Sequence, residues 1–476
     1  MRSRWLGALI VLAVLTALAL QAGVVARAGF AMGDFRAFYC AARVASHGEN
    51  PYHTQPLQAC EAQIVPRSFQ EKNPGVTIPA PLPAYAIAVL VPLAALPFGV
   101  SAAIWAAVLL AAWVAAIVAL ARAAGIAWEI ALAALSLGFG VLSLPFGEVV
   151  PLAVAGICGA AYYARAGRWR AAAACAALAM IEPHLGLPAA FALALWAPRA
   201  RLPLALLALG LASLALALLG PAANLEYFLS VLPAHALSEA TRDTQYSLTA
   251  VLAAAGMPLH ASVQAGALWY AAMLVLGVVV GLRLARESGN SAFAVCVPPA
   301  FAVFGGTFIH ITQIAAALPA ALLCVGAIRP ARRPIAVAAL LLLAVPWGWA
   351  VSPALIVAPL VPVAYLAWRY WSANVSAVLL AGIVAAVLLL GLRELYTLPK
   401  VHVGGRPATP AIDTRLPEAS WSAYSQRSST ATLAAWAVRV PTWSALFVLL
   451  ALLAADAATL GVAARPRLGY LTREIS

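Results

Sequence analysis

Long apolar runs separated by short polar turns dominate the chain. Clear examples are residues 100–120, 202–219, 375–392 and 444–462. A membrane-spanning helix needs roughly 20 predominantly apolar residues. Ala and Leu fill these runs without the alternation of polar and apolar residues that marks a barrel strand. We therefore predict an all-α polytopic membrane helix bundle with about 11–14 transmembrane helices, formed as a single domain over residues 1–476.

The turns between the runs fall into two classes. Short turns rich in arginine, such as residues 165–170, alternate with three longer segments of mixed charge, which are 28–77, 220–247 and 393–441. Short cytoplasmic loops of membrane proteins carry an excess of Lys and Arg. We therefore expect the arginine turns and the N-terminus in the cytoplasm, and the three long segments outside. The first long segment is expected to hold short helices lying on the membrane, at 34–46 and 56–64.

This orientation requires one irregular run. The N-terminal run at 5–26 is interpreted as a retained first span rather than a cleaved signal peptide, because it is long enough to cross and lacks a small-residue cleavage site. If every later run crossed fully, the turn at 165–170 would fall outside. We therefore expect one run between Pro79 and Pro145 to be re-entrant or split.

Composition supports a membrane protein. The chain is 64% hydrophobic and only 9% charged, whereas a soluble domain carries roughly 25% charged residues. Its net charge of +13 is explained by arginines that flank the spans. No basic segment with interleaved aromatic residues indicates a nucleic-acid partner. The expected location is the bacterial inner (plasma) membrane, with membrane lipids as the surroundings.

Cys40 and Cys60 lie in the first external segment, whereas the other four cysteines lie in apolar runs, where they are expected to be small packing residues. An exported segment is exposed to an oxidising compartment. We therefore predict a disulfide between Cys40 and Cys60. The alternative is a pair of unrelated thiols.

The few ionisable residues of the apolar region recur near the expected outer ends of the helices. They are Asp34, Glu148, Glu182, His184 and His310, and loop residues expected on the same side are Arg36, Arg43, Arg242 and Gln245. Charge within a bilayer is costly and is usually functional. Because these residues share one expected depth, near the outer ends of the helices, we predict an active site between external loops and helix ends. A proton-coupled pump would instead place its charges near the membrane midplane.

Each of these residues also has a structural interpretation. His310 alone would more often be a packing residue, and Glu148 could cap the following helix. Asp34 could be the N-cap of a helix at 35–46. No DxD, HExxH or CxxC motif predicts a metal site, and no phosphate-binding glycine loop predicts a soluble nucleotide-sugar enzyme.

The segment after the first span resembles a known family. Asp34, Tyr39, Gly48 and the pair at 51–52 resemble the D…Y…G-x-x-PY segment of glycosyltransferase family 87. These are integral-membrane enzymes of the GT-C fold, similar to the polyprenol-phosphate-mannose-dependent mannosyltransferases of bacteria. The prolines at 79–97 resemble the family's proline-punctuated second span.

Further resemblances extend to about residue 323. Residues 245–248 resemble the family's N-Q-S-L segment, and residues 308–310 resemble its S-W-x-H segment. Two positions depart from the pattern: Glu148 stands where the family usually has Gln, and Glu182 stands where it usually has Lys. Glu148 adds a carboxyl group, and Glu182 adds a second one while removing a positive charge that could have met the phosphate.

The resemblance implies a hexosyltransferase that uses a polyprenyl-phosphate sugar outside the membrane, with mannose as the expected hexose and a lipid or glycan as the acceptor. The lipid-linked sugar is a co-substrate, and no other cofactor is implied. Asp34 matches the catalytic aspartate, acting as general base in an inverting transfer. Residues expected to bind substrate are Tyr39, Gln245 and His310 from the resemblance, Arg36, Arg43 and Arg242 from charge and position, and Glu148, Glu182 and His184 from their shared level.

Two other functions fit the same pattern. A polytopic transporter or lipid flippase would share the helices but would line a path through the midplane with polar residues. A non-catalytic membrane assembly subunit would need no carboxylate facing a cavity.

Overall fold

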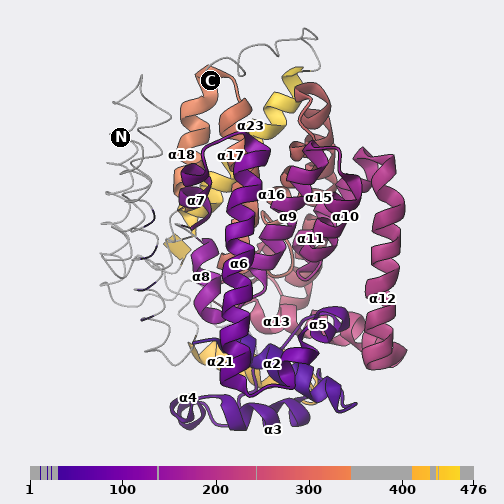
Figure 1. Cartoon of the computed structure of the whole chain (residues 1–476). Helices are drawn as coiled ribbons and strands as arrows, with labels where there is room; N and C mark the ends of the chain where they lie inside the picture. Colours follow the sequence, from indigo (N-terminus) through magenta and orange to yellow (C-terminus); the bar gives the residue numbers. More distant parts are fainter. Residues whose placement is uncertain are drawn as a thin grey trace.

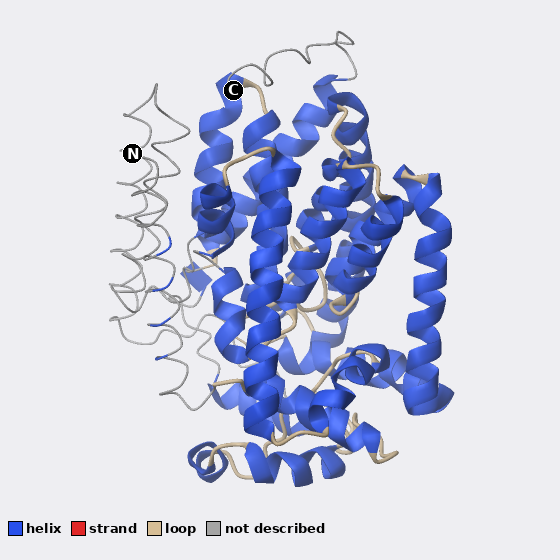
Figure 2. Ribbon diagram, viewed as in Figure 1, coloured by secondary structure: helices blue, strands red, loops and turns tan. Residues whose placement is uncertain are grey.

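The computed structural model describes residues 31–136, 139–242, 244–344, 410–428, 436–437 and 439–460, together with residues 11, 15, 19 and 23. Helices make up most of these ranges, and no β-strand occurs among the residues described (Figure 2). An isolated antiparallel bridge joins Gln245 and His310. The predicted all-α class is confirmed. The predicted span at 375–392, and all but four residues of the one at 5–26, lie outside the described residues.

Long helices run side by side through the bundle (Figure 1). In the described ranges, four helical stretches are long and apolar enough to cross a membrane. They are α6 (Phe98–Ala124), α12 (Pro198–Glu226) with its continuation, α15 (Leu259–Ser288) and α23 (Val440–Leu460). The chain is therefore a membrane protein, although the total number of spans stays a prediction.

Shorter helices and helical turns pack between the long helices or connect them. They are α7 (Trp128–Ser136), α8 (Phe139–Phe146), α9 (Val150–Arg165), α10 (Trp169–Ala179), α11 (Pro183–Trp196), α16 (Ala292–Ala302), η2 (Ile311–Ala317), α17 (Leu318–Ala327), η3 (Pro330–Arg332) and α18 (Arg333–Ala344). Their neighbours approach closely because small residues face one another: a Cβ added to Gly186 would collide with the backbone of Ala179. Small residues at helix contacts are the usual means of close packing in membranes.

Two runs between Pro79 and Pro145 form helices shorter than a full span, and which of them is re-entrant or split stays a prediction. The run after Pro79 forms α5 (Ala84–Ala94), whose 11 residues extend only about 16 Å at 1.5 Å per residue. The run at 128–146 is divided into α7 and α8. Arg165 at the end of α9 donates a hydrogen bond to the carbonyl oxygen of Ala123 near the end of α6. The end of α6, which carries Arg122, and the turn at 165–170 therefore lie at the same end of the bundle. The charge pattern predicts that arginine-rich turns share one end.

One end of the bundle is covered by an end layer, which we define as α2 (Gly33–Ser46), α3 (Thr54–Ile64), α4 (Arg67–Lys72) and α21 (Pro417–Ser428) (Figure 1). The two short helices expected in the first external segment are thus confirmed as α2 and α3. The layer joins distant parts of the sequence, because the Thr54 amide donates to Arg415 at 2.7 Å and the Thr77 amide donates to Ser420 at 3.1 Å.

The second long segment, 220–247, is more helical than its loop assignment implies. Gly220 has φ 69° and ψ 175°, which breaks α12, and the fixed φ of Pro221 restarts the helix. The chain then continues through η1 (Tyr227–Val231) and α13 (Leu232–Glu239) before α14 (Leu248–Ala254). Residues 393–409 of the third long segment lie outside the described residues.

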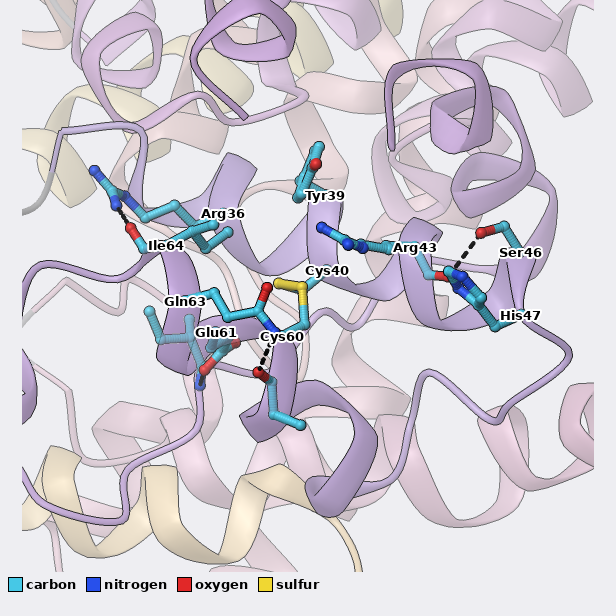
Figure 3. Close-up of a disulfide and its surroundings, with 12 residues drawn as sticks. Arg36, Tyr39, Cys40, Arg43, Ser46, His47, Cys60, Glu61, Gln63 and Ile64 are labelled. Carbon is cyan, nitrogen blue, oxygen red and sulfur yellow. Dashed lines mark hydrogen bonds between the residues drawn. A yellow bond between two sulfur atoms is a disulfide. The ribbon is translucent and has the colours of Figure 1, made fainter. Parts of the chain in front are cut away.

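The predicted disulfide between Cys40 and Cys60 is present and ties α2 to α3, with the two Cα atoms 5.6 Å apart (Figure 3). The other four cysteines are free, as expected, and three of them are buried. The disulfide closes a short loop in the layer that carries Asp34.

Replacing Cys40 by Ala is expected to lower the stability of this layer by about 3 kcal/mol, because the cross-link restricts the unfolded chain. The melting temperature of the purified protein in detergent measures the effect. Reductant should lower the wild-type melting temperature to that of the variant and leave the variant unchanged. An unchanged melting temperature in the variant would show that the disulfide does not stabilise the layer.

Candidate active site

A cavity of about 810 Å³ lies where the end layer meets the broken helices of the bundle. Three connections between consecutive helices contribute to its lining: between α8 and α9, between α10 and α11, and between α16 and η2. The carboxyl, guanidinium and imidazole groups that line it belong to Asp34, Glu148, Glu182, His184, His235, Glu239, Arg242 and His310. Six of the residues predicted from sequence therefore meet at one cavity.

Asp34 is placed by the start of α2. The N-cap of this helix is Met32, whose side chain makes no capping hydrogen bond, and Asp34 lies in the first helical turn. The N-cap interpretation of Asp34 is therefore wrong. The next residue, Phe35, is fully buried and stacks on Trp105 with ring centroids 5.4 Å apart. This anchor fixes the helix while Asp34 lines the cavity.

Glu148 is brought beside Asp34 by a tight turn at Gly147. Gly147 has φ +75°, and a Cβ there would lie 2.7 Å from the Cβ of Phe35, so only glycine fits. The Trp105 indole donates to the Gly147 carbonyl at 2.8 Å. The N-cap of α9 is Val149, so the capping interpretation of Glu148 is wrong as well.

Asp34 and Glu148 line the same cavity, and each carboxyl group influences the ionisation of the other. Burial raises the pKa of Asp34 to about 6, against the opposing attraction of Arg242. Burial, and then the negative charge of Asp34, raise the pKa of Glu148 well above its usual value. Asp34 is therefore the more acidic member of the pair and carries the charge at neutral pH.

Glu182 and His184 enter the cavity from the turn between α10 and α11. The His184 Nδ1 lies 3.4 Å from Glu182 Oε2, and the Tyr270 hydroxyl donates to the His184 carbonyl at 2.9 Å. Burial raises the pKa of Glu182 to about 8. Glu182 is therefore mostly protonated at neutral pH, and this departure from the family pattern does not place a full negative charge in the cavity.

The opposite wall is a hydrogen-bonded cluster around Glu239, a residue that the sequence analysis missed. Arg242 pairs with Glu239 at 3.2 Å, and the Gln245 amide donates to Glu239 Oε2 at 3.3 Å. Gln245 also contacts the His310 ring at 3.3 Å. Gln245 itself does not line the cavity, so its role is to hold Glu239 and His310 in place.

The end layer braces this cluster through α21. The Trp421 indole donates to Glu239, and the Arg242 guanidinium lies 4.7 Å from the centre of the Trp421 ring. His235 is another residue that the sequence analysis missed; it packs edge-on against Phe308 with ring centroids 5.0 Å apart. The only sequence signal for Glu239 was its position three residues before Arg242, a spacing at which opposite charges can pair.

Three predicted site residues face away from the cavity. The Arg36 guanidinium donates to the carbonyl of Ile64 (Figure 3). It also donates to the carbonyl of Ala31 and lies over the Phe98 ring. The Tyr39 hydroxyl donates to the Leu96 carbonyl at 2.8 Å. Arg43 is half-exposed and does not line the cavity. The structure gives Arg36 and Tyr39 packing roles in the end layer.

Helix starts add to the electrostatics of the cavity. Val150, Pro183 and Ile311 all line it, and each lies at the start of a helix, namely α9, α11 and η2. The N-terminal end of a helix carries a partial positive charge that favours anions. Together with Arg242, these helix starts make the cavity suited to a negatively charged group such as a phosphate.

One side of the cavity is apolar and reaches the outer surface of the bundle. Its lining includes Leu187 on α11, Phe228 on η1 and Ala267 on α15. Leu187 is 45% exposed and Phe228 is 61% exposed, on helices that would contact lipid. The cavity therefore combines a charged interior with an apolar flank. Among the described residues, no group of three or more His, Cys, Asp or Glu side chains is arranged to hold a metal ion.

Residues 83–304 match the family model of glycosyltransferase family 87. This match supports the family that the sequence motifs predict and indicates a membrane glycosyltransferase. The matched range contains Glu148, Glu182 and Arg242, whereas Asp34 and His310 lie outside it. No curated protein and no solved structure matches the chain significantly.

Proposed function

Because residues 83–304 match glycosyltransferase family 87, we propose that this protein transfers a hexose, with mannose as the first candidate, from a polyprenyl-phosphate donor to a lipid or glycan acceptor at the external face of the bacterial inner membrane. One observation supports it above all. Asp34 and Arg242, a base and a cation, face one cavity whose apolar flank reaches exposed Leu187 and Phe228.

The lining of the cavity is complementary to each part of a lipid-linked sugar phosphate. A polyprenyl chain would lie along the apolar flank between α11, η1 and α15. The phosphate would face Arg242, His310 and the helix starts, since cations and helix N-termini stabilise phosphate oxygens. The hexose would then occupy the space between this wall and Asp34.

The transfer is a single displacement. Asp34 accepts the proton of the acceptor hydroxyl as that oxygen forms a bond to the anomeric carbon. The bond between this carbon and the phosphate oxygen breaks, so the configuration inverts and polyprenyl phosphate leaves with the bonding electron pair. Arg242 and His310 stabilise the charge that develops on the leaving phosphate. The proton later passes from Asp34 to solvent.

The external location follows from the charge pattern of the chain. Arg165, Arg199 and Arg286 lie in the first or last turns of α9, α12 and α15, at helix ends remote from α2 (Figure 1), and the positive-inside rule assigns such ends to the cytoplasm. The Cys40–Cys60 disulfide in the end layer also fits an oxidising compartment. Both arguments support an external cavity.

The direct test is incubation of purified protein with labelled polyprenyl phosphate mannose or glucose in the presence of a membrane extract, followed by identification of the labelled product. We expect label from one donor to enter one lipid or glycan class, with inverted anomeric configuration. Absence of transfer from either donor, with correctly folded protein, would contradict the proposal.

The pH dependence of sugar transfer should report the ionisation of Asp34. A general base works only when ionised, and burial raises the pKa of Asp34 from 3.8 to about 6. We therefore expect kcat/KM to fall tenfold per pH unit once the pH drops below about 6. A pH profile of the purified enzyme tests this. A rate that stayed level down to the ordinary aspartate pKa would show that Asp34 is not the base.

A further inference from the structure

Two carboxyl groups meet in the cavity, and the mechanism above uses only one of them. Glu148 is nevertheless held firmly. Its neighbour Gly147 is constrained by the positive φ and by the Trp105 hydrogen bond. The Met32 amide, just before α2, donates to the Pro145 carbonyl at 2.7 Å. These contacts lock the turn that carries Glu148 against the start of the helix that carries Asp34.

The charges around Asp34 and Glu148 decide which of the two carboxyl groups is protonated. Two carboxylates in contact cannot both ionise at neutral pH unless a cation lies between them. Arg242 attracts Asp34 but is already paired with Glu239. Glu148 Oε2 is buried and receives no hydrogen bond, which is a costly environment for an ionised oxygen. A proton on Glu148 removes this cost, because a neutral carboxyl group is much less costly to bury than an ionised one.

We propose that Glu148 is a positioning residue that retains its proton and donates a hydrogen bond through it to the ionised Asp34. This rests on the proposed function. One lone pair of Asp34 is occupied by Glu148, so the other is directed to the acceptor hydroxyl. Glu148 never gains or loses a proton during turnover. Its role is to fix the orientation of the base.

The surroundings of Glu148 support retention of the proton. Glu182, from the turn before α11, acts on it as a further carboxyl group that disfavours ionisation. Thr312 of η2 also lines the cavity and acts in the opposite direction, but its effect on the pKa of Glu148 is smaller than those of burial and of Asp34. Arg242 acts mainly on Asp34 and Glu239. No cation acts directly on Glu148 among the described residues that influence it.

Three substitutions test the role: Glu148→Gln, Glu148→Asp and Glu148→Ala. Gln offers a neutral N–H donor at the same reach, so Glu148→Gln should keep nearly the wild-type kcat and the same acid limb in the pH profile. It should also remove any loss of activity at alkaline pH, since the amide cannot ionise. Glu148→Asp is too short to reach Asp34, so its kcat should fall as in Glu148→Ala.

Glu148→Ala should lower kcat about 10²-fold, because a base misplaced by about 1 Å costs that much, with little change in the KM for the donor. Its acid limb should move to higher pH, because Asp34 loses a hydrogen bond that favours its ionised form. Two results would overturn the proposal. One is a Glu148→Gln rate as low as that of Glu148→Ala. The other is an acid limb of Glu148→Gln at lower pH, which would mean that Glu148 is ionised in the wild type.

An infrared measurement separates this inference from the proposed function. The difference spectrum between wild type and Glu148→Gln at neutral pH should contain the C=O stretch of a protonated carboxyl group. This measurement needs no turnover. If the wild type transfers no sugar, the proposed function fails, while the infrared band still decides whether Glu148 holds a proton. Absence of the band would contradict the protonated state.

Discussion

Replacing Asp34 by Asn is expected to lower sugar transfer by about 10²- to 10⁴-fold, the usual contribution of a general base, while the melting temperature stays the same or rises slightly. Asn has the same shape but cannot accept the proton of the acceptor hydroxyl. The raised pKa of Asp34 means that its ionised form is destabilised by burial, so an uncharged side chain does not weaken the fold above pH 6. Transfer assays and thermal unfolding of the purified variant measure both effects.

A matched control for this variant is Asp413→Asn. Asp413 lies outside the cavity and pairs with Arg415 at 2.7 Å on the surface. Its replacement should leave transfer and stability close to wild type. Full transfer by Asp34→Asn would remove Asp34 from the mechanism, and equal losses in both variants would indicate a general effect of losing a carboxylate.

Replacing Arg242 by Met is expected to damage both folding and transfer. Glu239 is 1% exposed, and removing the partner of a buried charge costs about 3–5 kcal/mol. The leaving phosphate would also lose a cation, which typically lowers kcat about 10²- to 10³-fold. Thermal unfolding and transfer assays are again the measurements.

The double variant Arg242→Met/Glu239→Gln separates the two effects. Gln at position 239 leaves no uncompensated charge and can still accept the hydrogen bond from Trp421. The melting temperature should therefore recover toward wild type, while transfer stays low. Recovery of transfer together with stability would show that Arg242 acts only through the fold and does not contact the phosphate.

The helical class, and the cavity residues that lie where apolar runs are interrupted, were predictable because a bilayer restricts both the backbone structure and the placement of charged groups. Apolar runs can only be helices, and ionisable residues that interrupt them are expensive unless they face a site. Asp34, Glu148, Glu182, His184 and His310 all fit this pattern. Arg36 and Arg43 did not, because charge and loop position say nothing about which side of a helix a residue occupies.

Helical geometry explains those two cases. At about 100° per residue, side chains two and nine positions after Asp34 point about 200° and about 180° away from it. Arg36 and Arg43 thus face away from the cavity on α2. Glu239 was hidden for another reason: its role depends on contacts with Trp421 and Gln245, which lie far from one another in sequence.

The two departures from the family pattern become understandable in physical terms. A protonated Glu148 offers the same kind of neutral donor as the glutamine that usually stands there. Glu182, with a pKa of about 8, adds little charge at neutral pH. What Glu182 does not replace is the cation of the usual lysine, so the positive potential of the cavity must come from Arg242 and the helix starts.

The end layer has a consequence for how the protein is made. A chain leaves the ribosome N-terminus first, so α2, with Asp34, emerges long before α21, with Trp421. Until α21 arrives, the Glu239–Arg242 pair lacks its brace and the cavity lacks one wall. The brace on the Glu239–Arg242 pair therefore forms only after almost the whole chain has been made, and a truncation before Pro417 would remove both Trp421 and α23.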